Sequence, residues 1–139
     1  MGYRSDVRII VSGSGYKELC EYVKRESLKY ANNDYDYNLL NHTDNMWEKN
    51  NGDQVMIGWS YIKWYTPIYD DVNIIENGLN YLKEKGFSYR FSRIGEDYDD
   101  IEEKYSDGGL DQYLDWPCIE RYFDDEYNDF KVKVSGDNE

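Results

Sequence analysis

The pattern of apolar and polar residues is most pronounced in one central stretch of the chain. Residues 54–65, QVMIGWSYIKWY, form the longest apolar and aromatic run and contain a single charge, Lys63. Alternate residues of a strand point to opposite faces, so both faces of a strand here are expected to be largely apolar. We therefore expect a central strand that is covered on both sides. One face should carry Val55, Ile57, Trp59, Tyr61 and Tyr65, and the other Met56, Gly58, Ser60, Ile62 and Trp64.

Alternation predicts further strands on either side of this stretch. Residues 3–11 alternate between apolar and polar positions, and residues 87–94 alternate again, with three aromatic residues on one face. Residues 37–47 alternate poorly and indicate a short strand at an edge of the sheet. The sequence Asn-Asn-Gly at 50–52 favours a tight turn, so it predicts a hairpin that leads from the edge strand into the central strand.

Apolar residues that recur every three or four positions predict two helices. The first should begin at a capping residue, Ser14, and end near Tyr30. The second should begin at Asp70 or Asp71 and stop at Gly86, because glycine readily adopts the left-handed conformation that ends helices.

The predicted order of elements is strand, helix, strand, strand, helix, strand. It is typical of the ferredoxin-like βαββαβ arrangement, an α+β fold in which both helices cover one face of an antiparallel sheet. The first and third strands should be central, and the fourth should pair with the first. We expect residues 1–95 to form this core, residues 96–130 to form an acidic, aromatic-rich extension packed on it, and residues 131–139 to be a frayed tail.

The charge of the chain is concentrated in the predicted extension. The 139 residues have a net charge of −13, yet residues 1–95 hold 12 Lys and Arg against 13 Asp and Glu. Residues 96–129 hold 2 against 14, a net charge of −12. A disordered acidic tail has few aromatic residues, whereas this segment has many, so we expect it to fold back onto the core. Its charge disfavours direct binding to DNA or RNA.

Three interpretations of the acidic segment are open. Its carboxylates could form only a solvated surface that keeps the protein in solution. They could bind calcium, although Glu102 stands where an EF-hand loop requires glycine. They could also imitate phosphates and occupy a basic groove meant for nucleic acid. The residues expected to contact such a partner are Asp97, Tyr98, Asp99, Asp100, Glu102, Glu103, Tyr105, Trp116, Asp124 and Asp125.

Three arginines form a second candidate site. Arg4 and Arg8 on the first strand and Arg90 on the last strand should meet on the sheet face away from the helices, if the aromatic residues of the last strand face the helices. Their guanidinium groups could hold an anion, a phosphate or a nucleotide. They could instead pair internally with Asp6 and with the acidic segment folded over that face.

No catalytic, metal-binding or cofactor-binding motif is readable in the sequence. His42 is the single histidine and has no motif-linked nucleophile, so we expect no enzymatic activity, no metal and no cofactor. Cys20 and Cys118 have neither zinc-site nor disulfide-framework spacing, which favours a reducing interior. No signal peptide is recognisable, and no apolar run approaches the roughly 20 residues that span a bilayer. We therefore expect a cytoplasmic protein that does not contact membranes.

Three stretches of the chain resemble a group of small acidic proteins encoded by bacteriophages and prophages. They are MGYRSDVRIIVS at the start, GWSYIKWY in the central stretch and SYRFSRIGEDYDDIEE beyond it. The resemblance spans the chain from Met1 to about Asp125 and brings no catalytic residues with it. Phage proteins of this size and charge are often inhibitors of host defence, such as anti-CRISPR or anti-restriction proteins. The resemblance therefore implies a role in the cytoplasm of a bacterial host.

These observations lead to three hypotheses for function. The first is a non-enzymatic phage inhibitor of the anti-CRISPR type, whose acidic surface binds a host defence protein or ribonucleoprotein complex that has a basic groove. The second is a ferredoxin-like protein that binds a small molecule or nucleotide, or an enzyme that sequesters or cleaves a defence signal, with Arg4, Arg8 and Arg90 around an anion. The third is an assembly protein whose acidity serves solubility alone. We expect a monomer, or a dimer formed through the core.

Overall fold

The computed structural model describes residues 3–30, 35–65, 69–119 and 123–133. The helices in this part of the chain are α1 (Gly13–Ser27) and α2 (Asp70–Lys85), with short 3-10 turns η1 (Leu28–Tyr30), η2 (Leu39–His42) and η3 (Tyr127–Asp129). The strands are β1 (Ser5–Ser12), β2 (Asn45–Lys49), β3 (Gln54–Ile62), β4 (Tyr89–Ile94), β5 (Ile101–Ser106), β6 (Cys118–Ile119), β7 (Phe123–Asp124) and β8 (Lys131–Val132).

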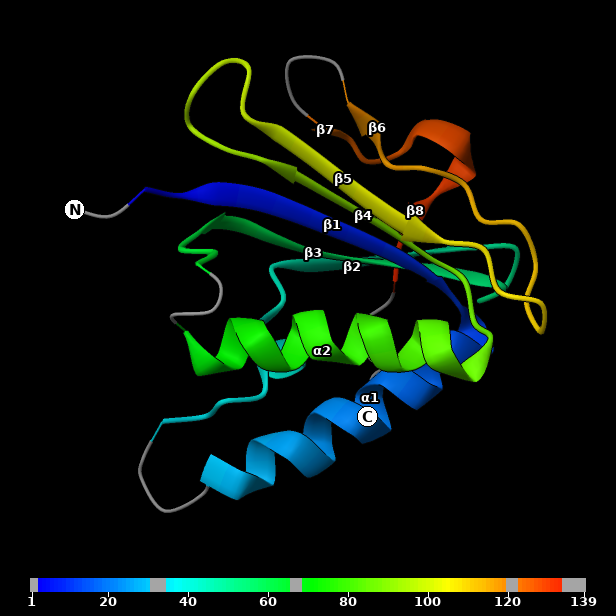
Figure 1. Ribbon diagram of the computed structural model, residues 1–139. Coiled ribbons are helices and arrows are strands. Elements are labelled where there is room, and N and C mark those ends of the chain that lie inside the picture. Colours follow the sequence, from blue (N-terminus) through cyan, green and yellow to red (C-terminus); the bar gives the residue numbers. More distant parts are fainter. Residues whose placement is uncertain (1–2, 31–34, 66–68, 120–122, 134–139) are drawn as a thin grey trace.

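The described residues form an α+β fold with an antiparallel sheet, which confirms this coarser part of the predicted fold. Two helices accompany an antiparallel sheet of six strands in the order β5-β4-β1-β3-β2-β8, and β6 pairs with β7 in a separate small sheet. Both helices lie on one side of the large sheet, while β6 and β7 lie on the other side (Figure 1). The β4–β5 hairpin spans residue 95, so the expected boundary between core and extension falls within the sheet.

The helix boundaries follow local capping chemistry. Helix α1 begins one residue after Ser12, whose hydroxyl accepts a hydrogen bond from the backbone N–H of Gly15 at 2.9 Å. The prediction of Ser14 as the cap is therefore wrong, since Ser14 lies in the first turn. Helix α2 begins after Tyr69, so the two aspartates predicted as caps stand in its first turn instead. Gly86 ends α2 with φ of 95°, as predicted.

The main hydrophobic core lies between the helices and one face of the sheet. Strand β3 lies between β1 and β2, and its residues Val55, Ile57 and Trp59 face the helices, as the alternation predicts. Met56 faces the other way and belongs to a second cluster of buried residues. The central strand is therefore covered on both sides. The helices contribute Leu19, Val23, Val72, Ile74, Ile75, Leu79 and Leu82 to the main core.

A bulge near the end of β3 reverses the faces of the residues that follow it. In the β1–β3 pairing, Val7 lies opposite Trp59 but Ser5 lies opposite Ile62, so β3 holds one extra residue. Tyr61 within this bulge has φ of 56°. A one-residue shift moves later side chains to the opposite face. Ile62 and Trp64 therefore pack on the helix side, and their predicted placement beside Met56 is wrong.

The hairpin between β2 and β3 turns where the sequence predicts. Residues 50–52 all have positive φ, of 54°, 57° and 93°, which is the conformation that Asn and Gly tolerate best. The edge strand itself is displaced from its predicted position at 37–47. The chain forms η2 at 39–42, where Asn38 caps the turn by accepting a hydrogen bond from Leu40, and β2 runs from 45 to 49.

The second cluster closes the sheet face opposite the helices. Leu114 and Phe130 pack there against Ile10, Trp47 and Met56, and all five are buried. The chain then reaches the edge of the sheet, where β8 pairs with β2. The expectation of a frayed tail is therefore wrong for residues 131–133; residues 134–139 lie outside the described part.

Replacing Leu114 with alanine should loosen this cover. Leu114 is fully buried, so Leu114→Ala should lower the free energy of unfolding by about 2–4 kcal/mol through lost burial and a residual cavity. Leu110→Ala is the matched control, because Leu110 is 77% exposed. Its effect should stay within about 0.5 kcal/mol. Urea unfolding followed by tryptophan fluorescence measures both, and equal destabilisation would contradict this packing.

Candidate functional site

Beyond β5, the acidic segment (residues 96–130) is fastened to the sheet by three charge pairs. Each pair joins a cation of a different strand to one carboxylate of the segment, and β1, β2 and β4 each supply one cation. Because each carboxylate reaches a different strand, the segment is held across the sheet face rather than at one edge. The pairs are Arg8–Asp125, Lys49–Asp115 and Arg90–Asp107.

Arg8 is buried, and its charge is fully compensated. Its Nε and Nη2 atoms donate to the two carboxylate oxygens of Asp125 at 2.8 and 3.3 Å, and Nη1 donates to two backbone carbonyls of the sheet. The guanidinium carbon lies 5.1 Å from the ring centre of Trp47 and 4.7 Å from that of Phe123. Every nitrogen of the side chain thus has an acceptor, which is the condition under which a charge is tolerated in the interior.

Arg90 is enclosed by aromatic rings. Its guanidinium carbon lies 5.6, 5.0 and 5.3 Å from the ring centres of Tyr105, Tyr113 and Trp116, and Nη2 donates to Asp107 at 2.7 Å. The rings of Tyr105 and Trp116, which the sequence predicts as partner contacts, therefore hold an arginine of their own chain. Tyr105 nevertheless leaves 60% of its surface exposed.

The three arginines of the predicted anion site have no contact residue in common. Arg90 and Arg8 both face away from the helices, but each is neutralised by its own carboxylate. Arg4 lies over the ring of Tyr61, 5.0 Å from its centre, and donates to the Tyr61 carbonyl at 3.3 Å. The internal pairing that the sequence left open thus applies to Arg8 and Arg90. Asp6 is not their partner, because its carboxylate accepts from the backbone N–H of Tyr61.

Besides Asp125, two more of the predicted partner contacts are paired within the fold. Asp100 and Glu102 accept hydrogen bonds from Nη2 and Nε of Arg93, each at 2.9 Å, and Asp100 also accepts one from the hydroxyl of Tyr3 at 2.6 Å. Both partners favour the charged carboxylate. The bond from Arg93, and after it the bond from Tyr3, hold the pKa of Asp100 below its ordinary value of 3.8. These groups order the turn between β4 and β5.

Four other predicted contacts remain at the surface, and we call them the acidic face. Their carboxylates have no hydrogen-bond or ion-pair partner among the residues that the structure describes. Tyr98, also a predicted contact, is 81% exposed between two of them. Asp125 is not part of this face, since it is bound to Arg8. The acidic face consists of Asp97, Asp99, Glu103 and Asp124.

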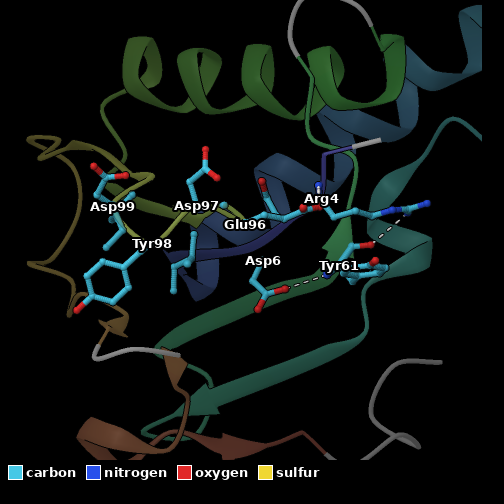
Figure 2. Close-up of a pocket in the computed structure, with 11 residues that line it drawn as sticks. Arg4, Asp6, Tyr61, Glu96, Asp97, Tyr98 and Asp99 are labelled. Carbon is cyan, nitrogen blue, oxygen red and sulfur yellow. Dashed lines mark hydrogen bonds between the residues drawn. The ribbon is translucent and has the colours of Figure 1, made fainter. Parts of the chain in front are cut away.

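An open groove of about 620 Å³ lies at the end of the sheet beside this face. The start of β1, the bulge of β3 and the loop between β4 and β5 form its walls. Arg4 and Tyr61 lie at one end, and Tyr98 and Asp99 lie at the other, with Asp6 between them (Figure 2). The groove therefore joins an arginine of the predicted anion site to residues of the predicted partner-binding site.

Sequence reasoning missed several residues of this groove. Tyr61 was expected to share a face with Val55, Ile57 and Trp59, but the bulge turns it out and leaves 69% of its surface exposed. Ile94 and Ile101, which are opposite each other in the β4–β5 pairing, line the groove as well. The alternation of β4 does place Ile94 on the same face as Arg90. No local signal marks the bulge itself.

Other features of the described chain add no site. Within it, no group of three or more His, Cys, Asp or Glu side chains could hold a metal ion, and no helix is long and apolar enough to cross a membrane. His42 is exposed and lies 3.1 Å from a carboxylate oxygen of Asp36. Comparison of the chain with protein-family models, curated proteins and solved structures gives no match. The resemblance to small phage proteins thus stays a hypothesis.

Removing the Arg90 side chain should release the acidic segment. Arg90→Ala leaves a space among three rings and deprives Asp107 of its partner, so it should lower the free energy of unfolding by about 2–4 kcal/mol and speed proteolysis within residues 107–119. Arg4→Ala is the control, because Arg4 makes one long hydrogen bond and a surface ring contact. Limited proteolysis with mass spectrometry measures both; the same cleavage rate in the two variants would contradict the fastening role.

The Asp100–Arg93 pair should make stability depend on pH in acid. Because the folded pKa of Asp100 is below 3.8, its ionised form stabilises the fold above that pH, and the contribution is lost as the pH falls through the folded pKa. The melting temperature of Asp100→Asn should therefore lie a few degrees below wild type at about pH 6, and the gap should close in stronger acid. Thermal melts across this range measure it. Asp99→Asn, at an exposed unpaired position, should show no such gap.

Proposed function

We propose that the protein is a non-enzymatic inhibitor that uses its acidic face to occupy a basic, nucleic-acid-binding surface of another protein. One observation carries the proposal: the cations of this side of the sheet are consumed inside the fold, whereas the carboxylates of the acidic face are not. Arg8 and Arg90 are covered and paired, so they cannot offset the exposed negative charge locally. What remains outside is a mainly negative surface with tyrosines among the carboxylates.

Such a surface has the chemistry needed to compete with nucleic acid. Carboxylates held on strands and turns can stand where phosphates stand, and complementary charge accelerates association with a basic groove. Exposed tyrosines supply contact area at low entropy cost and tolerate water. Tyr98, Tyr105 and Tyr113 are 81%, 60% and 71% exposed. Since Tyr105 and Tyr113 are already held around Arg90, their side chains lose less conformational entropy when they bind a partner.

We propose a bacterial defence complex, of the kind blocked by anti-CRISPR proteins, as the target class. This step depends on the resemblance to small acidic phage proteins together with the acidic face. We also propose that β4-β1-β3-β2 with α1 and α2 form a ferredoxin-like core, on which residues 96–130 are an extension. The order of those four strands and the position of both helices on one side support this assignment.

No observation favours the alternative of an anion-binding or nucleotide-cleaving protein. Arg8 and Arg90 are already paired, and Arg4 shares its groove with four carboxylates. The experiments below therefore test the inhibitor proposal alone.

Affinity capture from bacterial lysate tests the proposal with two matched variants. The face variant combines Asp97→Asn, Glu103→Gln and Asp124→Asn, and the control variant combines Glu18→Gln, Glu21→Gln and Glu84→Gln on partly or fully exposed helix positions. Both remove three negative charges. The wild type and the control should recover the same nucleic-acid-binding complex, and the face variant should recover it about tenfold less well, because several exposed charge pairs are lost.

Two further measurements make the outcome decisive. Capture should weaken as salt is raised, and an added single-stranded oligonucleotide should displace the complex if the acidic face occupies a nucleic-acid path. The mechanism would be refuted if the face variant recovered the complex as well as the wild type does, and if neither high salt nor the oligonucleotide reduced that recovery.

A further inference from the structure

The groove beside the acidic face exposes apolar surface in a concave setting. Tyr61 and Tyr98 expose 69% and 81% of their surfaces, and Ile101 exposes 46%. All three line the same cavity of about 620 Å³. Aromatic rings exposed in a hollow are characteristic of recognition sites, whereas single exposed apolar residues on a convex surface need no explanation.

The charges around these rings determine whether a positively or a negatively charged group can bind in the groove. The groove is lined by the carboxylates of Asp6, Glu96, Asp97 and Asp99 against one cation, Arg4. Asp6 and Glu96 each accept one backbone N–H, from Tyr61 and Arg4 respectively. The other two carboxylates have no such partner in the part of the chain that is described. A negative groove with exposed rings suits a cation and repels an anion.

The described chain holds both kinds of cation between rings and carboxylates. Lys49 and Lys104 each lie over one ring and pair with a carboxylate, whereas the cations that combine a carboxylate with two or more rings are arginines. Arg8 is held by two rings and one carboxylate, and Arg90 is held by three rings and one carboxylate. Arg4 already lies over the ring of Tyr61 within the groove, 5.0 Å from its centre. The planar guanidinium stacks on rings and donates to both oxygens of a carboxylate, which the compact ammonium of lysine cannot match.

We propose that the groove binds an arginine side chain from an extended, basic segment of the partner protein. The inference depends on the proposed function and narrows it, because it assigns the anchoring contact to one site of the acidic surface. The incoming guanidinium lies against Tyr98 and is attracted by the negative charges of Asp97 and Asp99, while Ile101 contacts the aliphatic part of the side chain.

Arg4 is a competitor built into the same groove. Its guanidinium covers the Tyr61 ring and offsets part of the negative charge, yet its side chain makes one hydrogen bond of 3.3 Å and no ion pair with a described carboxylate. Removing this side chain should therefore free a ring and make the groove more negative. Arg4→Ala should strengthen binding of an arginine peptide. If the groove instead held an anion, the same substitution should abolish binding of that anion.

Fluorescence anisotropy with two labelled peptides tests the proposal on the full chain. One peptide alternates arginine with glycine, and the other has lysine in place of each arginine, so their charges are equal. The arginine peptide should bind about threefold more tightly. The groove pair, Asp97→Asn with Asp99→Asn, should weaken its binding about fivefold, while the outer pair, Glu103→Gln with Asp124→Asn, should change it less than about twofold.

Single substitutions with matched controls complete the experiment. Tyr98→Ala should weaken binding about threefold, and Tyr127→Ala, at another exposed tyrosine of the acidic segment, should not. Arg4→Ala should strengthen binding about threefold, and Lys24→Ala, which removes an exposed positive charge from α1, should leave it within about twofold. Circular dichroism melts confirm that each variant is folded.

The outcomes separate this inference from the proposed function. Equal losses for the groove pair and the outer pair, or weaker binding on Arg4→Ala, would overturn the groove as the anchor while leaving the acidic face intact as a partner surface. If neither pair alters peptide binding or capture of the nucleic-acid-binding complex, both the groove and the proposed function are wrong. Selective loss with the groove pair, together with the gain on Arg4→Ala, establishes the arginine site.

Discussion

Arg8 places a full positive charge beneath the segment that closes one face of the sheet. A buried guanidinium is tolerated only where acceptors reach its nitrogens, because an unpaired charge in the interior costs several kcal/mol. Asp125 meets this requirement from a position 117 residues away in the chain. Arg90 imposes a similar requirement: Asp107 and two backbone carbonyls accept from its Nη atoms, while its Nε has no partner in the described part of the chain. A purely apolar segment would leave both charges unpaired, so the segment that closes this face has to be acidic.

This requirement divides the carboxylates of the acidic segment into two groups. One group is turned inward: Asp107, Asp115 and Asp125 neutralise cations of three strands, and Asp100 orders the hairpin turn through Arg93. The carboxylates of the acidic face form the other group, and they have no cation partner among the described residues. The same composition thus supplies both the fastening of the segment and the negative potential of the surface. The cations decide which carboxylates are available to a partner.

The groove has a different origin, in the bulge of β3. An extra residue lets Tyr61 leave the sheet with a left-handed backbone, and the carboxylates of Asp44 and Asp6 accept the N–H groups of Ser60 and Tyr61 that the bulge frees from the ladder. The ring is thereby turned outward at the end of the sheet, next to the loop between β4 and β5. A local irregularity of one strand therefore shapes the site where rings and carboxylates meet.

The sequence alone determined those features that neighbouring residues encode. Alternation identified β3 and the orientation of Arg90, glycine identified the end of α2, and the turn at 50–52 identified the hairpin, because periodicity and turn propensity act over a few residues. Composition likewise located the excess charge in residues 96–129. Only the tertiary structure decided which carboxylates pair with Arg8 and Arg90, that β8 adds to the sheet, and that Tyr61 opens a groove. Those outcomes depend on contacts between residues far apart in the chain, which leave no local pattern to read.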